Sequence, residues 1–165
     1  MRIIYLIITL FFSASTAFGQ LPEKWGAPTK NSFEGADRIV LYVPDNANTA
    51  IRVFSNLIQS QGFKLDYQGK EGITTDFHLL AKSLSSPKNM MISITAIVSQ
   101  DTPTILTLSG YTMKDSHKFR NKKSRAEACV FVGSVNQLPK AGFQALIALA
   151  STYPQGRVMY LERKF

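Results

Sequence analysis

The chain has 165 residues, a formal net charge of +8 at pH 7 and one cysteine. A chain of this length can bury an ordinary core in one domain, so it needs neither a disulfide framework nor a structural metal. The basic excess is compatible with an anionic partner and equally with simple solubility.

The first 19 residues are typical of a signal peptide. Arg2 precedes an apolar block that ends at Phe12, and small residues follow up to Gly19. The block is too short to span the roughly 30 Å hydrocarbon core of a bilayer as a helix. The sequence therefore predicts export to the periplasm or the exterior, with Gln20 first in the mature chain and a retained anchor as the alternative.

A linker is expected at residues 20–36, which include two prolines, two glycines, Asn31 and Ser32, and a single domain at 37–165. The domain opens with an apolar strand at 38–43. Asp45 or Asn46 is expected to cap the helix that follows, whose apolar residues recur at spacings of three and four. Gly62 should end that helix in a Schellman motif.

The remaining chain alternates between strand patterns and one more helical pattern. The second helix is expected to begin near Asn136 or Pro139. Further strands are expected at 63–68, 73–82, 90–99, 103–113, 126–132 and 157–163.

The order is thus β-α-β-β-β-β-β-α-β. It predicts an α+β domain, with a curved antiparallel sheet of about six or seven strands and two helices packed on one face. Four hydroxyl residues on the central strands suggest that the other face of the sheet is polar: Ser93, Thr95, Thr107 and Ser109.

The succession DRIVLYVPDNANTAIRVFSNLIQSQGFKLDYQ … GITTDF, with LSGYT and the closing QGRVMY, resembles small exported bacterial proteins of unknown function. Their shape is similar to the helix-grip repeats of the outer-membrane-assembly lipoprotein C and to TATA-binding-protein-like folds. The resemblance covers residues 37–165 and implies a two-layer α+β domain. It brings no functional residue, and the acylated cysteine of the lipoprotein is absent.

Candidates for catalysis are few. Asp76 and His78, two residues apart on an expected strand, would share a face, and they offer a hydrolase-like site, although a surface pair is the favoured interpretation. Cys129 stands between apolar residues, so we expect it to be buried and inert. The two histidines and one cysteine show no recognisable metal-ligand spacing, and no glycine-rich phosphate loop occurs, so neither a metal nor a cofactor is predicted.

The basic run at 114–125 is the strongest interaction candidate. Its alternative interpretation is a solvated loop. If the run binds a partner, Phe119 would add an apolar contact, and five side chains would contact phosphates or carboxylates: Lys118, Arg120, Lys122, Lys123 and Arg125. An envelope protein or an anionic glycan or lipid surface is the expected partner, and export argues against nucleic acid.

Three functions are therefore weighed. The leading one is an exported, non-enzymatic binding domain that acts through the open sheet face or the basic run. The second is an enzyme with its site near Asp76 and His78. The third is a carrier of lipid or another small ligand, which needs a cavity between helices and sheet. Residues such as Phe54, Leu57 and Phe143 would line that cavity, although they are more simply explained as core.

Overall fold

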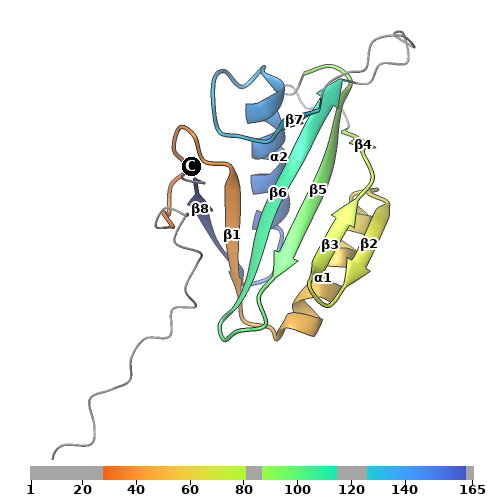
Figure 1. The fold of residues 1–165 in the computed structure, drawn as a ribbon, viewed down its shortest axis with the longest axis vertical. Coiled ribbons are helices and arrows are strands. Elements are labelled where there is room, and N and C mark those ends of the chain that lie inside the picture. The colour runs from red at the N-terminus through yellow and green to blue at the C-terminus, as the bar shows by residue number, and fades with distance from the viewer. Residues whose placement is uncertain (1–27, 81–86, 115–125, 163–165) are drawn as a thin grey trace, which may run out of the picture.

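The computed structural model describes residues 28–80, 87–114 and 126–162 (Figure 1). Their elements follow the order β1 (Arg38–Val43), α1 (Ala47–Ser60), β2 (Leu65–Gly69), β3 (Gly72–Thr75), β4 (His78–Leu79), β5 (Met90–Val98), β6 (Thr104–Lys114), β7 (Glu127–Ala128), α2 (Leu138–Ser151) and β8 (Arg157–Leu161).

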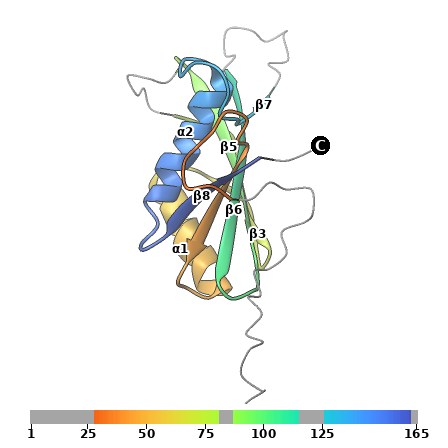
Figure 2. The ribbon, with the colours of Figure 1, turned by 90° about the vertical axis from the view of Figure 1, so that its left-hand side faces the viewer.

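In the described residues, eight strands form one antiparallel sheet in the order β2-β3-β5-β6-β1-β8, with β4 also paired to β5 and β7 to β6. Both helices lie on the same side of this sheet (Figure 2). The predicted α+β class, with two helices on one face of an antiparallel sheet, is confirmed.

Helix α1 begins and ends as its sequence predicts. The Asn46 side chain accepts a hydrogen bond from the Thr49 N–H at 3.0 Å, which satisfies one free amide of the first turn. At the other end Gly62 has a φ of +88°, and its N–H donates to the Gln59 carbonyl while Phe63 N–H donates to Ile58. These two bonds define a Schellman motif.

Helix α2 lies close against the sheet because Gly142 has no side chain. A Cβ atom placed there would overlap the Thr112 methyl group of β6 and would lie 2.7 Å from the Cys129 sulfur, far inside van der Waals contact. On the same side of the helix, Phe143, Leu146 and Ala150 are buried in the core. Close approach at one glycine thus sets how α2 sits on the sheet.

The strand expected at 73–82 was predicted wrongly as one strand, because it is interrupted between β3 and β4. The interruption changes the position of His78, one of the two candidate catalytic residues. Thr74 lies opposite Thr95, whereas His78 lies opposite Ile92. From Thr74 to His78 the chain advances four residues, but the paired strand β5 advances only three, from Thr95 to Ile92. The extra residue is a β-bulge between β3 and β4. The bulge places the His78 side chain on the helix-covered face of the sheet, where Ile92 also lies. Without the bulge, strict alternation would have placed His78 on the other face of the sheet, with Thr74.

Two further differences concern the strand count and the segment around β7. The bulge divides one expected strand in two, which gives eight strands instead of six or seven. The strand expected at 126–132 shrinks to Glu127–Ala128. Beyond it the backbone of Phe131 bonds with Gly35 and Ala36 instead of a sheet strand, and Thr29 pairs with Tyr160 at the outer edge of β8.

Candidate functional site

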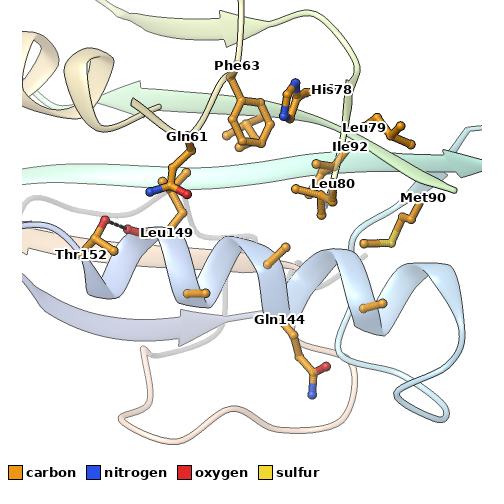
Figure 3. A pocket seen from close by; sticks show the side chains of 14 residues that line it. Gln61, Phe63, His78, Leu79, Leu80, Met90, Ile92, Gln144, Leu149 and Thr152 are labelled. Atoms are coloured by element: carbon orange, nitrogen blue, oxygen red, sulfur yellow. Dashed lines mark hydrogen bonds between the residues drawn. The ribbon is translucent and has the colours of Figure 1, made fainter. Parts of the chain in front are cut away.

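A hollow of about 770 Å³ opens on the helix side of the sheet (Figure 3). We call it the groove. It is bounded by Gln61 at the end of α1, Ala145 on α2, His78 on β4 and Ile92 on β5. Its floor is thus the sheet, and its walls come from both helices and from β4.

The groove exists because of where α1 ends and what α2 carries. Helix α1 ends at Ser60 in the Schellman motif, so α1 does not extend over the start of β5. The flank of α2 that faces this space carries Ala141, Ala145 and Ala148, at spacings of four and three. Methyl groups leave open a space that larger side chains would fill.

Apolar side chains make up the floor and one wall. Met90, Ile92 and Ile94 of β5 form the floor and are nearly inaccessible to water. On the wall opposite α2, the rings of Phe63 and His78 pack with their centroids 4.6 Å apart. Water therefore reaches mainly the rim.

Polar side chains are unevenly placed along the groove. Figure 3 shows Gln61 and Thr152 at one end, and Leu80 and Met90 at the other. Thr152 Oγ1 donates to the Leu149 carbonyl at 2.6 Å, so its oxygen retains acceptor capacity. The groove thus has one polar and one apolar end.

The described lining carries no Asp, Glu, Lys, Arg, Ser or Cys. Gln144, although at the rim, points away from Phe63 and His78 in Figure 3. Across the described ranges, no group of three or more His, Cys, Asp or Glu residues is placed to hold a metal ion. What the lining offers a ligand is apolar contact and a few hydrogen-bonding groups, from Gln61, His78, Gln144 and Thr152.

The structure assigns Asp76 and His78 to different surroundings. The Asp76 carboxylate lies 3.9 Å from the Lys64 ammonium at an exposed position. His78, by contrast, stacks on Phe63 and lines the groove. An exposed ion pair of this length contributes little to stability, and the pairing expected from their two-residue spacing does not form.

Cys129 is buried, as predicted, with 1% of its surface exposed. Burial raises the pKa of its thiol to about 12, because the thiolate would lose its hydration. The neutral thiol is a poor nucleophile.

The five basic residues proposed for binding, Lys118, Arg120, Lys122, Lys123 and Arg125, lie outside the described residues. The described residues on either side of this segment are Lys114, at the end of β6, and Ala126, before β7. Their role stays a prediction.

The core interpretation of Phe54 and Phe143 is confirmed, because both are fully buried between helices and sheet. Leu57 is partly buried against the same core. None of the three lines the groove, which lies farther along β5. The one sequence signal for the groove was the spacing of alanines on α2. The same spacing also occurs where a helix packs closely against its neighbours, so it indicates a groove only once the position of α1 is known.

The opposite face of the sheet carries the expected hydroxyl groups. Thr74, Thr95 and Ser109 lie side by side in one cross-strand row. Tyr67, which pairs with Thr74, is about half exposed, as is Tyr111 near the far end of β6. This face is mixed in polarity.

Comparison of the chain with protein-family models, with curated proteins and with solved structures found no match. The resemblance to exported proteins of the helix-grip type therefore stays a prediction. None of the helices in the described ranges has the length and apolar character needed to cross a membrane.

Proposed function

We propose that the protein is an exported, non-enzymatic binding domain whose site is the groove, and that its ligand is a small, predominantly apolar molecule. The observation that carries this proposal is a hollow of about 770 Å³ with apolar floor and walls. Small-molecule sites commonly have volumes of about 300–1,000 Å³ and a mostly apolar lining with few polar groups.

Packing supports the same conclusion. Protein interiors are close-packed, and voids much larger than a water molecule are few. Filling the groove would have needed only larger side chains in place of Ala145 and Ala148, since both stand on a regular helix and line the hollow. Of the apolar lining, Leu79, Leu80, Ala145 and Ala148 still expose surface to water. A ligand in the groove would remove that surface from water, which is favourable at about 25 cal/mol for each Å².

The other functions have less support from the described residues. An enzyme centred on Asp76 and His78 would need the two side chains together, but Asp76 lies beside Lys64 and His78 faces the groove. Binding of an envelope protein or an anionic surface by the basic run at 114–125 is compatible with a ligand in the groove and stays a separate prediction.

Binding of the neutral, solvatochromic dye Nile red to the mature chain tests this proposal. Dye fluorescence should rise and shift to shorter wavelength as the groove is occupied. Ala145→Phe places a ring in the groove, and the dye Kd should rise by at least about ten-fold, equivalent to about 1.4 kcal/mol.

The matched control is Asn56→Phe, because Asn56 is exposed on α1 and does not line the groove. It adds the same ring to a helix surface and should leave dye affinity within about two-fold of wild type. Equal affinity in Ala145→Phe and wild type, with both proteins folded by circular dichroism, would contradict the proposal.

A further inference from the structure

We propose that the ligand is an amphiphile with a hydrogen-bond-donating head, which lies at Gln61 and the C-terminal end of α1 while an alkyl tail extends toward Met90. This inference rests on the proposed function, since it names the class of molecule that binds in the groove and the end of the groove at which its head group lies. It predicts that alcohols and amines are bound in preference to carboxylates.

The direction follows from the uneven lining. Gln61 and Thr152 supply the neutral polar groups at one end, and the far end offers Leu80 and Met90. Eleven helical steps separate Ala141 from Thr152 along α2, which corresponds to about 16 Å. That length accommodates an extended decyl chain, so head and tail can occupy opposite ends.

The preference for a donor follows from the helix ends at the polar end of the groove. The last turn of a helix carries a partial negative charge on its carbonyl groups, equivalent to about half an electron. Gln61 is the C-cap of α1, and Thr152 is the C-cap of α2. Neither helix has a basic residue in its last turn to offset this charge. A donor or cation is therefore stabilised there, and a carboxylate is not.

The net charge of the chain argues for the opposite preference, because +8 attracts anions at long range. At 0.15 M salt, however, charges separated by more than about 8 Å are largely screened. The groups that touch the ligand should then decide, and the described lining includes no lysine or arginine.

The experiment is a titration of the mature chain, labelled at methyl groups for NMR, with 1-decanol, decylammonium or decanoate below their micelle-forming concentrations at 0.15 M salt. All three should shift the methyl signals of Met90, Ile92 and Ala145. A helix end changes affinity by about two- to five-fold for one charge, favourable for a cation and unfavourable for an anion. Decylammonium should thus bind at least about three-fold more tightly than decanoate.

Head position is read from intermolecular nuclear Overhauser effects. The methylene beside the head group should contact Gln61 and Thr152, and the terminal methyl should contact Met90. Gln61→Leu should reduce the ratio of the decanoate Kd to the 1-decanol Kd. Gln59→Leu, the same change at an exposed position on α1 that does not line the groove, should leave the preference unchanged.

The two proposals fail in different ways. Tighter binding of decanoate, or a reversed chain direction, would overturn the donor-headed amphiphile while groove binding stands. Absence of methyl shifts at Met90, Ile92 and Ala145 with all three probes would overturn groove binding as well.

Discussion

Cys129 shows how a single buried residue sets a measurable property of this domain. Its sulfur lies next to the Gly142 backbone, where α2 packs tightly against Thr112 of β6. Burial raises the pKa of the thiol from 9.0 to about 12. A raised pKa means that the folded protein holds its proton more strongly than the unfolded chain does.

The sign of the pH dependence follows. Between about pH 9 and 12 the unfolded chain has lost the thiol proton and the native state retains it, so stability falls as pH rises. Compared with Cys129→Ala, the free energy of unfolding of wild type should fall by about 1.4 kcal/mol for each pH unit in this window. Urea unfolding at several pH values measures this difference.

Burial also raises the pKa of the Tyr153 hydroxyl. This hydroxyl donates a hydrogen bond to an Asp45 carboxylate oxygen at 2.8 Å, which raises the same pKa further. Tyr153 remains in both proteins of the comparison, so its contribution cancels. A stability difference between wild type and Cys129→Ala that stays constant from pH 8 to 12 would contradict the Cys129 prediction.

At the scale of the element, α1 is specified by its own ends. The sequence predicted an N-cap at Asp45 or Asn46 and a stop at Gly62, because each acts on backbone groups within a few residues, and the structure selects Asn46. The stop has a consequence beyond the helix, because α1 does not extend along the start of β5 and therefore bounds one end of the groove.

Asn46→Ala should lower the free energy of unfolding by about 1 kcal/mol, because the Thr49 N–H loses its side-chain acceptor. Asn46→Asp keeps an acceptor and should retain most of the stability. Asn48→Ala is the control, since Asn48 is exposed in the first turn. Equal losses from Asn46→Ala and Asn48→Ala in urea unfolding would show that the cap contributes nothing.

At the scale of the whole molecule, the spacing between the helix layer and the sheet depends on Gly142. A Cβ there would meet the Thr112 methyl group and the Cys129 sulfur. Gly142→Ala should therefore destabilise the protein by about 1–3 kcal/mol, as overpacking of a core does. An exposed helix position would respond in the opposite direction, because alanine favours the helix more than glycine does.

Thr112→Ser provides the rescue for this overpacking. It removes the methyl group but keeps the hydroxyl that donates to the Glu127 carbonyl at 3.3 Å. The double variant should be more stable than the sum of the two single changes predicts, measured by urea unfolding. Strict additivity would mean that Gly142 and Thr112 do not limit the approach of the layers.

The sequence by itself determined the two helices, the caps of α1, the antiparallel α+β class and the burial of Cys129. These features depend on side-chain periodicity and on contacts within a few residues, which the sequence displays directly.

Only the tertiary structure decided the position of His78 and the existence of the groove. The face of His78 depends on a bulge fixed by pairing with β5, and by the hydrogen bond from the Asp76 N–H to the Lys64 carbonyl. The groove depends on the separation of α1 from α2, helices that are far apart in the chain. No local pattern records such distances, because each follows from how every element packs on the same sheet.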